Sequence, residues 1–401
     1  YNMADTFFIG KLNDPLQVAA ATVVMPCFML LTGFANLFGL GGSSLISRCL
    51  GTDDQEKARH CASFCIWTGA AVALLYGIAV ILLEPVLFPL LGASEGTWES
   101  CRQYAFWTIG VGAVPTVMNA ELAHLIRAEG YSRPAGFGVA FGGVLNIILD
   151  PIFIFALRLN IAGAAIATML SNLIAMGYFL GFLYHIRKNT VITPDPKAFS
   201  IRQHIPGEVL SVGLPGFVMT MMSTISNGVL NHTVAGYSDT AIAGMGIAKK
   251  IDLLAYAIAQ GMTQGTLPLI GYNYTSGSLK RMKAAIKTAF AYSFLVACAG
   301  TVLLWTLAAP ISRCFIADAE TVRYGQHFLK IICLACPTTA INFMVITVFQ
   351  AIGKRVQPLC LSLLRKGSLD VVFMLLLNLA LIHLSEPTRL QLISYAVFCL
   401  K

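Results

Sequence analysis

Stretches with no or very few charged side chains, each about 20 residues or longer, recur along the whole of this 401-residue chain. Such a stretch is long enough to cross a bilayer as an α-helix, in which every backbone polar group is satisfied internally. Ten such spans are predicted. They are Pro15 to Ser47, His60 to Leu83, Gln103 to Ile126, Pro134 to Leu157, Ile161 to Ile186, Val209 to Asn231, Thr240 to Tyr272, Thr288 to Ile311, Ile331 to Ala351 and Pro358 to Ile382.

Composition places the chain among membrane proteins. Hydrophobic residues make up 57% and charged residues 11%, whereas a soluble domain has about a quarter charged residues. The mean hydropathy is +0.73. The formal charge of +8 belongs to short loops between spans, so it indicates membrane orientation and not nucleic-acid binding. The eleven cysteines lie mostly in or beside apolar runs, and we expect them to be small buried side chains, neither disulfides nor metal ligands.

The two ends of the chain extend the topology. Residues 1–10 are apolar, and another apolar segment follows Arg389, which predicts twelve helices with the first and last truncated. Loops on one side of the predicted bundle carry 15 of the 27 Lys and Arg residues, and the opposite loops carry seven. By the positive-inside rule the richer side is cytoplasmic. We therefore expect a multi-pass protein of the inner cell membrane with both termini in the cytoplasm.

An internal repeat divides the chain. The segment IRAEGYSRP, which begins at Ile126, matches FQAIGKRVQP, which begins at Phe349, with an offset of 223 between aligned residues. Asp14 and Asp239 align in a second pair of segments with an offset of 225. Chance recurrence of loop signals is the competing explanation, but two anchors agree. The repeat predicts two six-helix pseudo-symmetric lobes, residues 1–190 and 209–401, joined by a cytoplasmic linker at 191–208.

Asp150 is a lone carboxylate in the apolar run NIILDPIFIF. An ionisable side chain in hydrocarbon costs at least about 2.5 kcal/mol, so it is a candidate functional group by default. Asn146 precedes it by four residues and shares its helix face. The predicted topology puts Asp5, Tyr1 and Thr168 at nearly the same depth, in the outer half of the N-terminal lobe.

The five side chains of this cluster supply two carboxylates, an amide, a phenol and a hydroxyl. Oxygen ligands of this kind suit a hard cation such as Na⁺. The same two carboxylates also suit a proton, because desolvation and like charge both favour the protonated acid. A hydrogen-bonded network that only holds helices together is the alternative, and it is the simpler explanation for Asn146 and Thr168 taken singly. No metal site other than one for Na⁺ is expected.

Charged residues also occur within spans of the second half. Asp252 lies near Lys249, and Asp370 follows Lys366 by four residues, spacings that allow pairing along a helix. We assign Asp370, Lys366 and Asp252, together with Met222, to a substrate cavity. A purely structural role for the charged residues is an equally weighted alternative. We expect Glu121, near the cytoplasmic end of its span, to reach only the membrane interface.

Taken together, these segments resemble the multidrug and toxic compound extrusion (MATE) family, of bacterial type. The resemblance covers essentially the whole chain and is carried by YNMADTFFIGKL, LGTDDQEKA, IRAEGYSRP, NIILDPIFIF, AGAAIATMLSN, GLPGF, LPLIGYNYTSG and FQAIGKRVQP. It implies a twelve-helix, two-lobed antiporter that expels organic, often cationic drugs in exchange for Na⁺ or H⁺. By similarity, Asp5, Tyr1, Asn146, Asp150 and Thr168 match the family's N-lobe cation site. Ser223 and Thr339 stand where some members carry acidic residues, so a second cation site in the C-lobe is not supported.

These observations lead to two functional hypotheses. The first is a cation-coupled multidrug efflux antiporter that works by alternating access, is monomeric, and needs no cofactor beyond its coupling ion. The second is a flippase for a lipid-linked precursor, since related bilobed folds move such lipids. An enzyme is not expected, because no HExxH or GxSxG motif occurs within any predicted span. ATP-driven transport is not expected either, because the sequence has no GxxxxGK[ST] loop.

Overall fold

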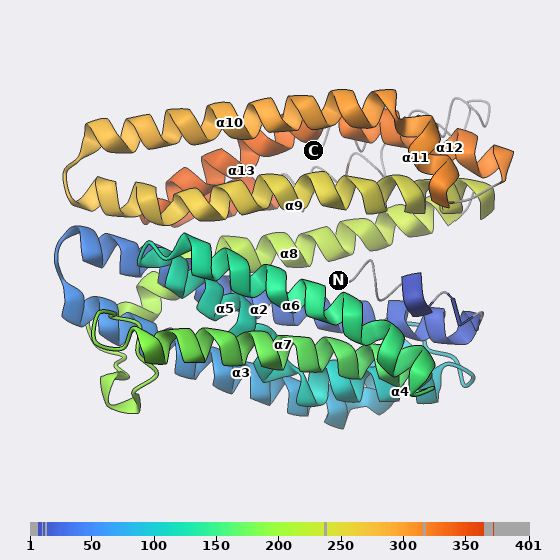
Figure 1. The fold of residues 1–401 in the computed structure, drawn as a ribbon, viewed down its shortest axis with the longest axis horizontal. Helices are drawn as coiled ribbons and strands as arrows, with labels where there is room; N and C mark the ends of the chain where they lie inside the picture. Colours follow the sequence, from blue (N-terminus) through green and yellow to red (C-terminus); the bar gives the residue numbers. More distant parts are fainter. Residues whose placement is uncertain are drawn as a thin grey trace. The chain divides into compact units, whose positions relative to one another are not determined.

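The computed structural model describes residues 7–9, 11, 12, 14–235, 239–315, 318–364 and 372, and its regular secondary structure within them is entirely helical. The all-α prediction is therefore confirmed. The chain forms two compact units, Tyr1–Thr220 and Met221–Lys401. Figure 1 shows long helices running side by side within each unit.

The first unit is built around one central helix. Its helices are α2 (Pro15–Gly51), α3 (Gln55–Leu90), α4 (Trp98–Ala105), η1 (Phe106–Val111), α5 (Ala113–Ala128), α6 (Ser132–Pro151), η2 (Ile152–Ala156), α7 (Asn160–His185), η3 (Pro196–Ala198) and the first part of α8 (Ile205–Ala235). α5 contacts α2, α3, α6 and α7. The largest described core cluster draws most of its buried side chains from α2, α3 and α5, so these helices form the interior.

The second unit is also built around one helix, α9 (Asp239–Thr275). Beyond the last part of α8 its other helices are α10 (Leu279–Thr306), α11 (Ala308–Phe315), α12 (Ala319–Cys333), α13 (Cys336–Ala351) and α14 (Val356–Ser362). α9 contacts α10, α12 and α13. Several helices are preceded by an aspartate whose side chain accepts a hydrogen bond from a backbone N–H of the first turn. These N-cap residues are Asp14 for α2, Asp54 for α3 and Asp318 for α12.

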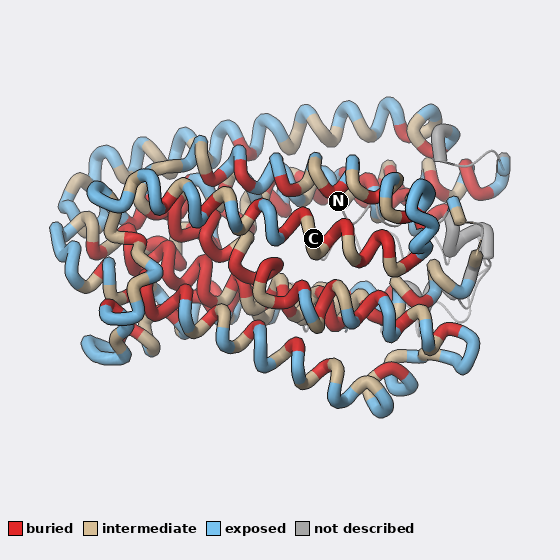
Figure 2. Tube along the Cα trace, turned by 60° about the horizontal axis from the view of Figure 1, so that its bottom comes forward, coloured by how far each residue is buried: buried red, intermediate tan, exposed pale blue. Residues whose placement is uncertain are grey.

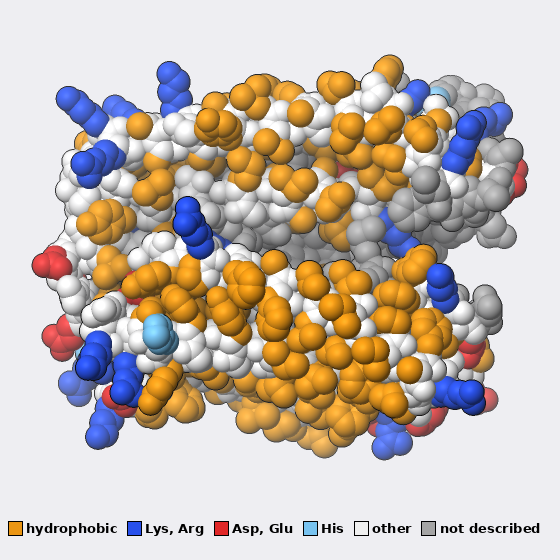
Figure 3. Space-filling model, in the orientation of Figure 1, with side chains coloured by type: hydrophobic (Ala, Val, Ile, Leu, Met, Phe, Trp, Pro, Cys, Tyr) orange, Lys and Arg blue, Asp and Glu red, His pale blue; other side chains and the backbone are white. Residues whose placement is uncertain are grey.

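The surface is that of a multi-pass membrane protein. Six described helices are each long and apolar enough to cross a bilayer, namely α2, α3, α6 with η2, α7, α8 up to Leu230, and α10. Two bent pairs, α4–η1 with α5 and α12 with α13, also qualify when each is taken as one span. Figure 3 shows hydrophobic side chains covering the length of the helices and most Lys and Arg side chains at their ends. Buried residues line the inner faces of the helices (Figure 2).

The internal repeat is visible in the helix boundaries. α2 and α9 both have 37 residues, and their first residues, 15 and 239, and last residues, 51 and 275, are each 224 apart. α5 and α13 both have 16 residues, from 113 to 128 and from 336 to 351, so both ends are 223 apart. Gly130 and Gly353, two residues after these helices, both have a positive φ, 95° and 77°. A glycine in the left-handed conformation therefore follows both helices at the same position.

Two of the predicted spans are bent. The span predicted at Gln103 to Ile126 changes direction by 48° where η1 gives way to α5. A side chain at Gly112, the residue between them, would lie 2.5 Å from the carbonyl oxygen of Thr108, so only glycine fits this bend. The span predicted at Ile331 to Ala351 is divided between α12 and α13, which meet at 41°. Pro337 lies in the first turn of α13, where its missing N–H costs least.

The segment before α8 is fastened to the first unit. Ser63 Oγ donates to the carbonyl oxygen of Asp195 at 3.0 Å, and Trp67 Nε1 donates to that of Pro194 at 3.1 Å. Thr190 Oγ1 donates to Glu129 Oε2 at 2.5 Å. The first part of α8 then packs on α2, where the backbone of Leu37 occupies the space beside Gly213. This packing explains why the structural boundary lies at Thr220, within α8, and not at residue 208, where the predicted linker ends.

Candidate functional site

Asp150 lies at the last turn of α6, and its side chain is completely buried. Pro151 follows it, and the chain continues as the π-helix η2. Proline lacks the N–H that would bond one turn back, so the helix loses its regular ladder directly after the carboxylate. A widened turn of this kind often marks a functional position within a helix.

Asn146 joins Asp150 to the neighbouring helix. Its Nδ2 donates to Asp150 Oδ1 at 3.2 Å and to Thr168 Oγ1 of α7 at 3.3 Å. Asn146 and Asp150 are 0% exposed and Thr168 is 1% exposed. Asn146 Oδ1 has no hydrogen-bond partner among the described residues. Three of the five side chains predicted from the sequence are thus brought together in the interior.

The network extends to residues that the sequence reasoning missed. The carbonyl oxygen of Thr168 accepts hydrogen bonds from Ser171 Oγ at 3.0 Å and Asn172 Nδ2 at 2.9 Å. Asn119 Nδ2 of α5 donates to Asn172 Oδ1 at 2.8 Å. Asn172 follows Thr168 by four residues, which places it on the same helix face and was the available signal. The polar contacts therefore connect α5, α6 and α7.

Asp5 and Tyr1 lie outside the described residues, so their place in the site stays a prediction. The described residues nearest to them in the chain, 7–9, contact η2. The ring of Phe8 lies 6.3 Å from that of Phe155 in η2, in an edge-to-face arrangement. The last turn before residue 10 therefore packs beside the helix segment that follows Asp150.

The prediction for Glu121 was wrong. Its side chain does not reach the interface but is 0% exposed, and neither oxygen has a hydrogen-bond partner among the described residues. The reason is the position of α5, which is surrounded by α2, α3, α6 and α7. A position near the end of a span predicts contact with water only when the helix lies at the edge of the bundle.

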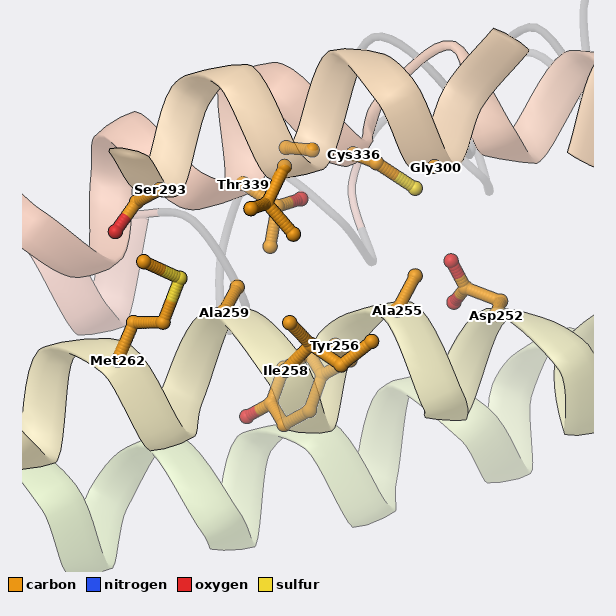
Figure 4. Close-up of a pocket in the computed structure, with 12 residues that line it drawn as sticks. Asp252, Ala255, Tyr256, Ile258, Ala259, Met262, Ser293, Gly300, Cys336 and Thr339 are labelled. Carbon is orange, nitrogen blue, oxygen red and sulfur yellow. The ribbon is translucent and has the colours of Figure 1, made fainter. Parts of the chain in front are cut away.

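A small cavity in the second unit is lined by α9, α10 and α13 (Figure 4). Its volume is about 40 Å³, and the residues that line it include Asp252, Tyr256, Ser293 and Thr339. Ser293 is 3% exposed, and its hydroxyl has no hydrogen-bond partner in the described part of the chain. The cavity suits a water or a single ion, because a drug-sized ligand needs about 300 Å³ or more.

The other residues assigned to a substrate cavity are only partly described. Met222 of α8 is half-buried and is not among the residues that line this cavity. Lys366 and Asp370 lie outside the described residues. Lys249 of α9 donates to Asn227 Oδ1 of α8. Of the predicted set, Asp252 is the residue that the structure places in a cavity wall.

The comparisons with known proteins agree with this architecture. The MatE family model matches residues 1–152 and 215–376. The chain belongs to the MATE family. The multidrug export protein MepA of Staphylococcus saprophyticus is 31% identical over 354 residues, 88% of this chain and 78% of that protein. MepA of Staphylococcus aureus strain MSSA476 is 28% identical over 378 residues, 94% of this chain and 83% of its own length.

Solved MATE structures share the fold. The crystal structure of a MATE P26A mutant superposes with a TM-score of 0.87 at 25% identity and covers 99% of this chain and 88% of that one. The predicted fold class is therefore confirmed. The MATE family match of residues 1–152 includes Asn146 and Asp150, and the match of 215–376 includes Asp252. Thr168 lies between the two matched segments.

Proposed function

We propose that this chain is a cation-coupled multidrug efflux antiporter that works by alternating access. The observation that carries the proposal is the burial of Asp150 with Asn146 and Thr168 inside the first unit. A carboxylate at this depth is costly for a protein that only has to fold. The MepA relatives, named as multidrug export proteins, support drugs as the substrate.

The coupling cation binds at the Asp150 cluster in this proposal. The Asp150 carboxylate, Oδ1 of Asn146 and Oγ1 of Thr168 offer oxygen ligands, and Asp5 and Tyr1 complete the site. A hard cation such as Na⁺ prefers such oxygens. A proton would instead neutralise one carboxylate and remove the repulsion between Asp150 and Asp5. Either ion changes the charge inside the first unit and so favours a different packing of its helices.

The substrate is a small organic molecule, and we propose that it is often cationic. Asp252 attracts positive charge from the wall of the cavity in the second unit. Since that cavity holds only a water or an ion in the described conformation, drug binding requires the surrounding helices to move apart. Replacing Asp252 with Asn should weaken export of cationic drugs more than export of neutral ones. An equal loss for both kinds would assign Asp252 a structural role.

We further propose a monomer in the inner membrane with both termini in the cytoplasm, and functional halves at 1–190 and 209–401. Positive charge concentrated in the loops on one side supports this orientation. The linker at 191–208 is held to the first unit by polar contacts such as that between Ser63 and Asp195.

Transport in proteoliposomes tests the proposed function directly. Sodium and pH gradients are imposed separately, and drug movement is followed with and without an ionophore that collapses each gradient. We expect one gradient to drive drug accumulation, and protein-free liposomes to show none. Drug movement that depends on neither the sodium gradient nor the pH gradient would contradict cation coupling. Movement of labelled lipid between leaflets without drug export would favour a flippase instead.

A further inference from the structure

Glu121 is a second buried carboxyl of the first unit, and the candidate cation site does not use it. It lies on α5 with no exposed surface, and neither oxygen has a hydrogen-bond partner within the described ranges. A charged carboxylate would have neither water nor a donor to stabilise it there. The side chain is therefore neutral in the described packing and carries a proton.

The surroundings of Glu121 are built to fit its side chain closely. A Cβ at Gly69 of α3 would overlap with Oε2 of Glu121. Cys61 and Cys65 are the ionisable groups that α3 presents to it. His124 lies one turn further along α5 and is 6% exposed.

The remaining neighbours of α5 present uncharged groups. α2 contributes Gly39, whose added Cβ would lie 2.7 Å from Cδ2 of His124, and Gly42, whose added Cβ would lie 2.7 Å from Sγ of Cys65. α7 reaches α5 through the amide of Asn172. Beyond His124, Arg127 Nη1 lies 3.4 Å from His124 Nδ1, near the end of α5. His124 thus lies between Glu121 and the charged end of the helix.

The internal repeat shows that the scaffold does not need a carboxyl at this position. α5 and α13 correspond with an offset of 223 at both ends, which places Met344 at the position of Glu121. Met344 is 2% exposed, so an apolar side chain of similar length fills the equivalent space in the second unit. The carboxyl of the first unit is therefore an addition that packing alone does not explain.

Glu121 is also separate from the Asp150 cluster. α6 meets α5 where a Cβ at Gly142 would lie 3.9 Å from Asn119 Nδ2. Asp150 lies eight residues beyond Gly142 on α6, about 12 Å along the helix. Glu121 lies two residues beyond Asn119 toward the end of α5, which is the direction away from Asp150. The two carboxyls are therefore about 15 Å apart along the helices.

The ligand that suits this position is a proton. A hard metal ion needs several oxygen ligands, but the groups that face Glu121 are Gly69 and the thiols of Cys61 and Cys65. We propose that Glu121 is a proton-binding site of the transport cycle, separate from the candidate cation site at Asp150. It holds its proton while α3 and α5 are packed as described, and passes it to water when their movement exposes the carboxyl on the side of His124. This inference rests on the proposed transport function but not on the identity of the ion at Asp150.

Chemical labelling of the wild-type protein provides one test. Dicyclohexylcarbodiimide adds to protonated carboxyl groups in apolar surroundings and leaves a stable adduct. Trypsin releases the fragment 103–127, in which Glu121 is the only side-chain carboxyl. Asp150 falls in the fragment 128–158, since the bond before Pro134 is not cleaved. We expect the fragment 103–127 to be labelled when the reaction is run at acid pH and not when it is run at alkaline pH. No adduct at any pH, or a constant amount at every pH, would overturn the proposal.

Variants provide the second test. Glu121→Gln keeps the shape but cannot titrate, and Glu121→Met introduces the residue found at the repeat position. We expect both to fold and to lose part of the pH dependence of drug export, whereas Glu99→Gln, at an exposed carboxyl on α4, keeps it. If both Glu121 variants keep the wild-type pH profile while Asp150→Asn abolishes coupling, the inference fails and the proposed function stands. Should the variants not fold, the labelling of the wild type decides.

Discussion

The side-chain amide nitrogen of Asn146 lies 3.2 Å from Oδ1 of Asp150, one helical turn later on α6. The same nitrogen lies 3.3 Å from Thr168 Oγ1 on α7. One amide therefore fixes the orientation of a carboxylate and a hydroxyl from two helices. Because all three side chains are buried, this orientation is set by the protein and not by solvent.

Replacing Asn146 with Ala should disturb both the fold and the coupling. The variant loses a buried donor, which should lower the free energy of unfolding by about 1–3 kcal/mol. The cation concentration for half-maximal drug export should rise about tenfold or more, as expected for a loss above about 1.4 kcal/mol in binding. Thr22→Ala, at an exposed hydroxyl that donates only to its own helix, is the control. An unchanged cation dependence in Asn146→Ala would argue against a cation site here.

Replacing Gly69 with Ala should destabilise the first unit, because the new methyl group would overlap with the Glu121 carboxyl. Overpacking of this kind typically costs about 1–3 kcal/mol. In the background of Glu121→Ala the cost should largely disappear, since the two positions are in contact. Thermal unfolding of the purified variants measures both effects. Gly143→Ala, where an added Cβ meets nothing within 4 Å, should not destabilise the protein.

The sequence predicted the helical class and pointed to Asp150, Asn146 and Thr168, which the structure brings together, for physical reasons. Long apolar runs admit few structures in a membrane, and the high cost of a buried carboxylate drew attention to Asp150. The spacing of four residues then identified Asn146. What sequence reasoning missed depends on tertiary packing. The bend at Gly112 and the complete burial of Glu121 follow from where α5 lies among its neighbours, which hydropathy along one helix does not report.

Helix ends were also harder to predict than helix positions. The span predicted from His60 is part of α3, which begins at Gln55, because charged residues continue the helix beyond its apolar part. Similarly, α10 begins at Leu279, nine residues before the predicted Thr288. A charged residue ends the hydrocarbon segment without ending the backbone hydrogen bonds of the helix.

Glu129 should give the protein a distinct pH dependence. Burial raises the pKa of this carboxyl above its usual value, and hydrogen bonds from Thr190 and Val191 offset only part of the effect. Folding therefore favours the protonated form, so its contribution to stability is present at acid pH and is lost as the pH rises through the raised pKa. The stability of the wild type relative to Glu129→Gln should fall with rising pH in thermal unfolding. A rise would contradict this assignment.

Glu208 should contribute more to stability than the nearby surface pair. Lys57 Nζ lies 2.8 Å from Glu208 Oε1 and Arg48 Nη2 lies 3.5 Å from Oε2, and all three side chains are about one-fifth exposed. Removing the carboxylate with Glu208→Ala should cost about 1–3 kcal/mol in unfolding free energy. The pair between Arg59 and Asp195 is exposed and 3.8 Å long, so Arg59→Ala should cost less than about 1 kcal/mol. Equal effects would show that burial does not separate the two pairs.

The central proposal is that a cation bound at Asp150 drives drug export. The most direct measurement is cation exchange driven by a drug gradient in liposomes that contain either the wild type or Asp150→Asn. The amide keeps the size of the side chain but carries no charge, so the account predicts a folded protein in which exchange is abolished. Undiminished exchange in Asp150→Asn would contradict the account.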